Sequence, residues 1–374
     1  MHYKHWKKVI GWVAILSLGG CVDPYRPPEI AAPNNYLVVD GFLNSKPGTT
    51  TSIRLSRTQN LSEKNTSVAE TRAVVTVETE GRATYAFRET GGGVYTLTDL
   101  VPQANQKYRL RIKTAKGVEY LSDFTTVVTT PVIDSVSWRP TSNGLQIYVN
   151  THDPKNNTRY YRWEFDETWE FFTPYNATLE LKDKQVITRA ENTYRCWSGE
   201  SSKSIMVGST ARLSQDVVSL FPLTTIPADS WKLSSRYSIL VRQYALSRDA
   251  YAFWEQLAKM TQNIGSLFDP QPFLLTGNMH CITNPSEPVL GYFSVGSVET
   301  RRIYVKRYQL PNWTINTGYS FCRLDTAKTL KDLIEMNFQP VSELEGGGGY
   351  LASDNYCVDC RLRGTNKKPA FWDE

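Results

Sequence analysis

Histidine is scarce in this 374-residue chain, and acidic residues are missing from its first twenty positions. Only His152 and His280, of four histidines, lie beyond those positions. A histidine-dependent triad or a histidine-rich metal site therefore has very few candidates. The chain also lacks the G-x-S-x-G, H-E-x-x-H and P-loop patterns that mark several enzyme classes. These absences favour a protein that is not an enzyme, and we expect no catalytic residues, metal or cofactor.

Glycine and proline are too infrequent for a collagen-like or low-complexity protein, at 23 and 19 residues. The chain is 40% hydrophobic and 21% charged, which is typical of a globular protein and not of a disordered chain or a coiled coil. Its length predicts two or three domains, each able to bury its own core.

The net charge of +5 is concentrated at the N-terminus. Lys4, Lys7 and Lys8 lie in the acid-free segment, and without them 39 basic residues face 37 acidic ones. No basic patch then remains to neutralise phosphates, so we expect no nucleic-acid partner.

Residues 1–20 have the parts of a secretory signal: three lysines, the apolar run Val9–Leu18 and small residues before Cys21. Ten residues span only about 15 Å as a helix, too short for a hydrocarbon core of about 30 Å. Leu18-Gly19-Gly20-Cys21 resembles a bacterial lipobox, which predicts cleavage before Cys21 and its lipidation. Several acyl chains on one residue would anchor the protein stably to a membrane. The alternative is an ordinary signal peptide with an incidental cysteine.

Residues 21–35 are rich in proline and predict an extended tether. Val22 follows the lipidated cysteine, and by resemblance to well-studied lipoproteins this favours the outer membrane. Which leaflet the protein faces stays open. No other segment reaches 18 consecutive apolar residues, so we expect no membrane-spanning helix.

The cysteines beyond Cys21 are candidates for disulfides, because an exported protein meets an oxidising environment. They are Cys196, Cys281, Cys322, Cys357 and Cys360. The C-x-x-C formed by the last two would need Cys322 and His280 to complete a zinc site, and it lacks a thioredoxin-like βαβ context. We predict that Cys196 pairs with Cys281, and Cys322 with one member of the C-x-x-C.

Residues 36–130 predict an immunoglobulin-like antiparallel sandwich. Short segments rich in β-branched and aromatic residues alternate with turn signals, and no helical periodicity intervenes. The expected strands lie at residues 36–43, 52–56, 73–78, 84–88, 94–98, 107–114 and 119–125.

Residues 131–374 predict a larger β-rich domain with one or two helices inserted. A proline-led entry, Trp138 and short strands at 145–150 and 160–165 resemble a fibronectin type III module. The fold class is therefore mainly β.

Further elements of this larger domain follow from its hydrophobic pattern. Residues 236–244 predict a buried strand, and Ser247 can cap a helix with apolar residues at helical spacing over 250–264. A second helix is expected at 326–338, and a hairpin is expected from residues 289–295 and 301–308. Gly346–Gly349 predict a flexible joint before the cysteine-bearing tail.

Residues 163–175 combine acidic and aromatic side chains. The acids are Glu164, Asp166, Glu167 and Glu170, which could supply a carboxylate pair for glycoside hydrolysis. We expect instead a solvated strand face, because Glu164 and Asp166 alternate with Trp163 and Phe165. The aromatics are Trp163, Trp169, Phe171, Phe172 and Tyr175, which predict either an exposed interaction surface or simple core filling.

The order of several short motifs, over essentially the whole chain after residue 20, resembles a known family. After the lipobox and tether they are Tyr36–Asp40, Tyr108–Leu110 with Gly117 and Tyr120, Ile133-Asp134, Tyr160-Tyr161-Arg162-Trp163, Phe268-Asp269-Pro270-Gln271-Pro272, Gly291-Tyr292-Phe293, Cys357-Val358-Asp359-Cys360 and Pro369-Ala370-Phe371-Trp372. The chain is similar to the "domain of unknown function 4249" lipoproteins of Bacteroidota. Such proteins are commonly encoded beside TonB-dependent outer-membrane receptors, and the family supplies no catalytic positions.

The resemblance implies an accessory role at such a receptor, similar in logic to SusD-type capture lipoproteins. Our first hypothesis is a non-enzymatic, lipid-anchored outer-membrane protein that helps the receptor capture or admit a nutrient of unspecified identity. A structural or assembly component of the envelope is the alternative. A surface glycosidase or peptidase is a third hypothesis.

Overall fold

The computed structural model describes residues 35–59, 68–262, 275 and 277–372. The protein is mainly β, as predicted, and the described residues include two α-helices, α2 (Arg248–Gln262) and α3 (Leu330–Met336). Residues 1–20, Cys21 and the tether up to residue 34 lie outside the described residues. None of the helices that are described is long and apolar enough to cross a membrane.

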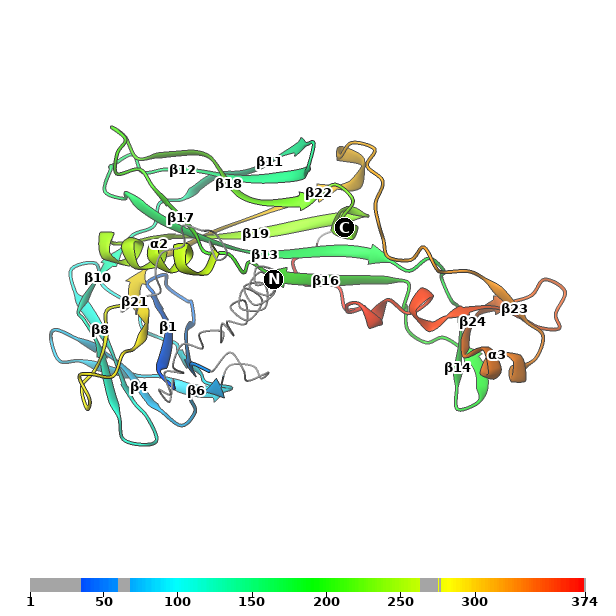
Figure 1. Cartoon of the computed structure of the whole chain (residues 1–374), viewed down its shortest axis with the longest axis horizontal. Helices are drawn as coiled ribbons and strands as arrows, with labels where there is room; N and C mark the ends of the chain where they lie inside the picture. The colour runs from blue at the N-terminus through cyan, green and yellow to red at the C-terminus, as the bar shows by residue number, and fades with distance from the viewer. Residues whose placement is uncertain (1–34, 60–67, 263–274, 276, 373–374) are drawn as a thin grey trace, which may run out of the picture.

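The first ten strands of the chain and two later ones form a twelve-stranded sheet around one core, which we call the N-terminal unit (Figure 1). Alternation produces this core: Leu37, Val39 and Leu43 of one strand point inward. The strands are β1 (Leu37–Asn44), β2 (Thr51–Arg57), β3 (Val68–Ala69), β4 (Val74–Thr79), β5 (Thr84–Ala86), β6 (Arg88–Gly91), β7 (Val94–Leu97), β8 (Lys107–Lys113), β9 (Glu119–Ser122), β10 (Thr125–Val128), β20 (Met279–Cys281) and β21 (Leu290–Gly296).

The last two strands of this unit come from late in the sequence. β21 lies between β1 and β10 and runs parallel to both, whereas the neighbouring β1 and β2 are antiparallel as predicted. β20 pairs antiparallel with β9. Buried side chains of Met279, Phe293 and Val295 fill the same core as β1 and β8. Residues 36–130 therefore do not complete this unit by themselves.

Gly291 allows the close approach of β21 to β1. Its φ is +125°, and a Cβ at this position would lie 2.0 Å from the carbonyl oxygen of Val39. The expected hairpin of residues 289–295 and 301–308 is wrong, because β22 (Val298–Lys306) pairs with β19 (Arg236–Ala245) in a different sheet. Ser297 links the two strands, so the chain changes sheets where a turn had been expected.

The second unit is a sandwich of two antiparallel sheets, in line with the predicted β-rich domain. One sheet has the order β11-β12-β18, and the other has the order β16-β13-β19-β22 with β17 also pairing with β13. Side chains from both sheets, including Ile147, Trp163 and Val241, form one core. The strands are β11 (Ile133–Thr141), β12 (Gly144–His152), β13 (Tyr160–Phe172), β16 (Arg195–Ser201), β17 (Met206–Ser209), β18 (Val217–Pro227), β19 (Arg236–Ala245) and β22.

Helix α2 follows β19 and lies between the two units (Figure 1). The side chain of Ser247 accepts a hydrogen bond from the backbone N–H of Ala250, which confirms the predicted cap. The helix packs its apolar face on a cluster that contains Phe42 of the first unit and Tyr244 of the second. This helix therefore joins the two units.

The remaining elements project from the second unit as a separate lobe, which we call the arm (Figure 1). They are β14 (Leu179–Lys182), β15 (Gln185–Thr188), β23 (Asp325–Ala327), α3, β24 (Phe338–Glu343) and β25 (Tyr350–Asp354). Helix α3 is shorter than the expected 326–338. Thr329 caps its start in a capping box with Asp332, and Asn337 ends it in the left-handed conformation with a φ of 55°.

Candidate functional site

The cysteines form two disulfides near the base of the arm. Cys196 is bonded to Cys360 and Cys322 to Cys357, which leaves Cys281 as the free thiol among the described cysteines. The expected Cys196–Cys281 pair is wrong, because Cys281 lies on β20 in the N-terminal unit and Cys196 on β16 in the second. The pairing of Cys322 with one member of the C-x-x-C is confirmed. The C-terminal segment is therefore linked covalently at two points, through Cys357 to Cys322 and through Cys360 to Cys196 on β16.

Most of the expected aromatic surface is core. Trp163, Trp169 and Phe171 are at most 3% exposed and face the opposite sheet, so the interaction-surface reading is wrong for them. Phe172 is 36% exposed at the end of β13, and the half-buried Tyr175 packs against a small cluster at the base of the arm. The core-filling alternative is the better description, because β13 continues for thirteen residues with every second side chain inward.

The four acids of β13 lie in two different environments. Glu164 and Asp166 are half-buried on the outer face, in line with the expected solvated face. Glu167 and Glu170 are buried, which corrects that expectation for them. The ammonium group of Lys232 lies 2.7 Å from the carboxylate of Glu167 and balances its charge. The hydroxyl of Tyr237 donates a hydrogen bond of 2.7 Å to the same carboxylate. Burial raises the pKa of Glu167, and Lys232 opposes that shift.

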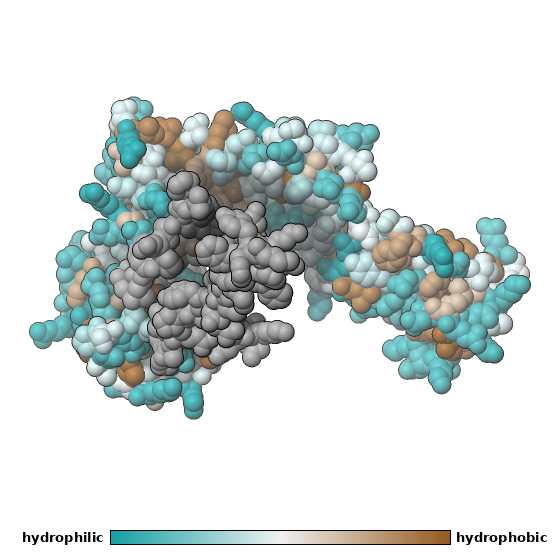
Figure 2. Space-filling model, in the orientation of Figure 1, coloured by the Kyte–Doolittle hydropathy of each residue, from teal (hydrophilic) through white to brown (hydrophobic). Residues whose placement is uncertain are grey.

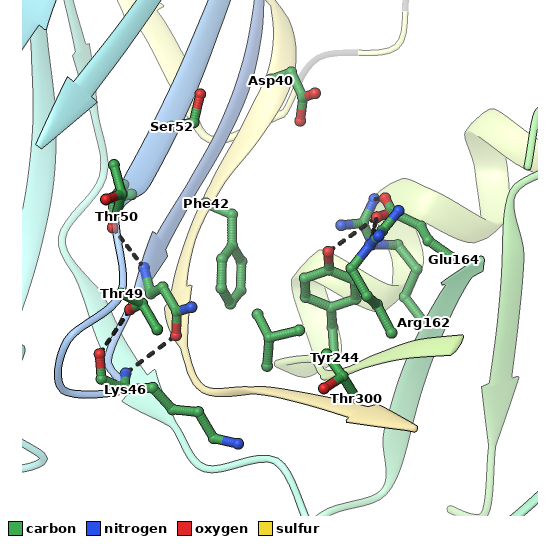
Figure 3. Close-up of a pocket in the computed structure, with 14 residues that line it drawn as sticks. Asp40, Phe42, Lys46, Thr49, Thr50, Ser52, Arg162, Glu164, Tyr244 and Thr300 are labelled. Atoms are coloured by element: carbon green, nitrogen blue, oxygen red, sulfur yellow. Dashed lines mark hydrogen bonds and ion pairs between the residues drawn. The ribbon is translucent and has the colours of Figure 1, made fainter. Parts of the chain in front are cut away.

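The outer face of β13 borders a cavity of about 450 Å³ between the two units. β1, β2 and the loop between them form one wall, and β13, β19 and β22 form the other. Figure 3 shows Asp40 and Phe42 on the first wall and Arg162, Glu164 and Tyr244 on the second. Pockets at unit boundaries are frequent ligand sites, so this inter-unit cavity is the candidate functional site.

Glu164 is the centre of a polar network on the second wall. Its carboxylate is 2.8 Å from Nη1 of Arg162 and accepts a hydrogen bond of 2.9 Å from the hydroxyl of Tyr244. Burial raises the pKa of Tyr244, and the nearby Glu164 carboxylate adds to the shift. The hydroxyl therefore remains a hydrogen-bond donor at neutral pH.

Arg242 and Asp166 form a second ion pair beside this network. Both terminal nitrogens of Arg242 donate to the carboxylate, one of them at 3.0 Å. The hydroxyl of Ser201 donates to the same carboxylate at 2.6 Å. Hydrogen bonding from Arg242 lowers the pKa of Asp166, and the same contact raises the pKa of Arg242. This bidentate ion pair fixes the orientation of both side chains.

Aromatic rings support the charged groups of the cavity. The guanidinium of Arg162 lies 4.5 Å from the ring centre of Tyr244 and 4.3 Å from that of Trp254 on α2. The ring of Phe42 meets that of Tyr244 edge to face, with centres 5.0 Å apart. The second wall is thereby pre-organised by contacts with α2 and with β1.

Asp40 stands apart from these pairs. Its side chain is exposed to the cavity and makes no hydrogen bond or ion pair with any described residue. The surrounding walls displace enough water to raise its pKa, although Arg162 opposes the shift. An unpaired carboxylate in such a place can accept hydrogen bonds from a ligand.

Of the residues that line this cavity, sequence reasoning singled out Glu164 as a candidate site residue. The alternation of Arg162, Glu164 and Asp166 with inward aromatics does indicate a polar outer face. Nothing in the sequence indicates that β1 lies opposite, because this depends on the late return of β21.

The two histidines outside the first twenty residues lie on the surface. His152 is 2.8 Å from Asp134, and His280 is 3.1 Å from Asp123. The contact with Asp134 raises the pKa of His152. Within the described parts of the chain, no group of three or more His, Cys, Asp or Glu side chains is arranged to hold a metal ion.

Comparison with known families gives one match, which covers most of the chain. A family model described as "Domain of unknown function (DUF4249)" matches residues 22–302. The matched region includes the N-terminal unit and nearly all of the second unit, whereas β23, α3, β24 and β25 of the arm lie beyond it. No curated protein matches the chain.

Proposed function

The chain belongs to the DUF4249 family, and from this premise we propose that it is a non-enzymatic, lipid-anchored outer-membrane protein. In this role it helps a TonB-dependent receptor capture a small nutrient. The lipid is attached to Cys21, and residues 22–35 hold the two units away from the membrane surface.

The observation that carries this proposal is the inter-unit cavity. Its two walls belong to different units, so a ligand in it contacts both of them. The volume of about 450 Å³ suits a small molecule. The polar groups of the second wall are already oriented by ion pairs and ring contacts, which reduces the entropy lost on binding.

The arm supports a contact with a protein partner. It projects from the second unit and carries apolar side chains among hydrophilic ones (Figure 2). Ile187 and Ile334 are 38% and 46% exposed. Two disulfides fix the base of this lobe, so its orientation can be kept while it touches a receptor.

Co-purification tests the proposal. The tagged full chain is extracted from its native membranes in mild detergent and isolated. We expect a TonB-dependent receptor barrel to be isolated with it in comparable amount. The Cys21→Ala variant should carry no lipid and should be absent from the membrane fraction. A preparation that contains no receptor barrel contradicts the proposal.

Growth of a deletion strain separates capture from the alternative role in envelope assembly. Failure to grow on one nutrient, with normal growth on others, supports capture. Sensitivity to detergents and antibiotics on every nutrient supports the assembly role instead.

A further inference from the structure

We propose that the inter-unit cavity binds the cationic nitrogen of a small organic ligand, an ammonium or guanidinium group, at Asp40. This inference rests on the proposed role as a ligand-capture protein and specifies the chemical class of the ligand. It follows from the way in which the charges around the cavity are paired.

The cations that line the cavity are already paired with carboxylates. Arg162 pairs with Glu164 at 2.8 Å, and Lys46 pairs with Glu299 at 2.8 Å. Arg242 pairs with Asp166 through both terminal nitrogens. An anionic ligand would have to compete with these carboxylates, and the geometry therefore disfavours one.

Asp40 is the carboxylate of this cavity that remains available. It lies on the wall opposite Arg162 and Glu164, with its side chain exposed to the cavity (Figure 3). Arg54 is its cross-strand neighbour on β2, yet the two side chains form no ion pair within the described structure. Both oxygens of Asp40 can therefore accept hydrogen bonds from an incoming cation.

Phe42 gives the ligand an apolar neighbour. It lies two residues after Asp40 on the same face of β1, and its ring stands between that strand and Tyr244 (Figure 3). A cation held at Asp40 can place its methylene groups along this ring. The described residues hold no cluster of metal ligands, so an organic cation fits better than a divalent metal.

Calorimetric titration of the purified full chain in detergent tests the inference. The probes are 1,5-diaminopentane for the ammonium class, butylguanidine for the guanidinium class and glutarate as an anion of similar size. We expect at least one of the two cations to bind and glutarate not to bind. Which of the cations binds more tightly identifies the head group.

Matched variants locate the binding site. Asp40→Asn should weaken cation binding at least about tenfold, because a charge-assisted hydrogen bond is lost. Asp40→Glu should restore part of the affinity, and Arg54→Gln should leave it unchanged or increase it. Asp183→Asn removes the same charge from the exposed turn between β14 and β15 and should have no effect. Circular dichroism of each variant checks its fold.

The outcomes separate this inference from the proposed function. If neither cation binds at 10-fold molar excess over millimolar protein, or if Asp40→Asn binds as the parent does, the assignment to Asp40 is overturned. If the receptor barrel co-purifies in that case, the capture role still stands. If a cation binds through Asp40 and no barrel co-purifies, the receptor role fails while the cavity assignment stands.

Discussion

Glu167 illustrates how a charged residue can be part of a core. It occupies an inward position on β13 between Phe165 and Trp169, where Lys232 and Tyr237 satisfy its carboxylate. Lys232 also pairs with Glu200, which is 44% exposed at its side chain. Lys232 therefore forms ion pairs with a buried carboxylate and with a more exposed one at the same time.

Neutralising Glu167 should destabilise the protein. We expect Glu167→Gln to lower the free energy of unfolding by about 1–3 kcal/mol, since Lys232 keeps only its more exposed partner. Glu335→Gln, which breaks an exposed pair with Lys331 on α3, should change it by less than about 0.5 kcal/mol. Urea denaturation measures both values, and equal effects would contradict the prediction.

The ion pair of Asp166 with Arg242 should make stability depend on pH. Its pKa is lowered in the folded protein, so the unfolded chain binds the proton more tightly. The contribution of the pair is therefore complete above about pH 4 and is lost as the pH falls further. The free energies of unfolding of the parent and of Asp166→Asn should differ at pH 7, and this difference should shrink as the pH falls below about 4. A difference that is constant over this range would refute the assignment.

At the residue scale, alternation predicted part of the site and misread another part. The outward positions of Glu164 and Asp166 follow from their spacing with Trp163 and Phe165. The same spacing predicts that the side chain of Glu167 points into the core, whereas its charge predicts that it is exposed to solvent. The conflict is resolved by Lys232, which lies 65 residues further along the chain and which no local pattern connects to Glu167. Asp40 could not be identified because the residues on the opposite wall of the cavity, beginning with Arg162, lie even further away in the sequence.

Elements formed by local pattern were predicted well. The expected strand at residues 36–43 corresponds to β1, and the expected helix over 250–264 corresponds to α2 as far as Gln262. The position of β21 was not predictable, because an apolar strand can pair with several sheets and only tertiary packing selects among them.

Gly291 provides a test of that strand position. Gly291→Ala should lower the free energy of unfolding by more than about 3 kcal/mol, because a Cβ would meet the rigid backbone of Val39 in a strained conformation. Gly81→Ala is the control, since its nearest neighbour is a side-chain oxygen 3.7 Å away. If thermal unfolding shows equal losses for both variants, the parallel contact of β1 with β21 is not formed as described.

The disulfide connectivity makes a further prediction at this scale. Alkylation of the denatured, unreduced protein should label Cys281 and leave the other four described cysteines unlabelled. The double variant Cys322→Ser/Cys357→Ser should lose about 2–5 kcal/mol of stability and expose the arm to limited proteolysis. Cys281→Ser keeps both bonds and serves as the control. Peptide mapping that finds a Cys196–Cys281 bond would reverse the assignment.

At the scale of the whole molecule, the predicted boundary at residue 130 separates strands that share one core. Met279, Val289, Phe293 and Val295 are buried together with β1 and β8. The sequence could not reveal this, because all strands of the second sandwich except β22 lie between the early strands and β20. The mainly β class was nevertheless recognisable, since it depends on short strands with local alternation.

A fragment of residues 35–130 should consequently fail to fold cooperatively. A fragment of residues 35–310 contains all strands of both units and should show a cooperative transition, although less stable than that of the full chain without the Cys196–Cys360 bond. Circular dichroism during urea denaturation distinguishes the two. Cooperative unfolding of the shorter fragment would show that β20 and β21 are dispensable.

The parallel pairing of β1 with β21 also determines how late in translation the N-terminal unit can be completed. β1 is among the first strands to leave the ribosome, and its partner follows roughly 250 residues later, which is roughly 10–50 s at about 5–20 residues per second. During that interval the early strands have a gap beside β1 that a neighbouring chain could fill. The newborn chain therefore needs either a holding chaperone or immediate passage to the next compartment before its first unit can close.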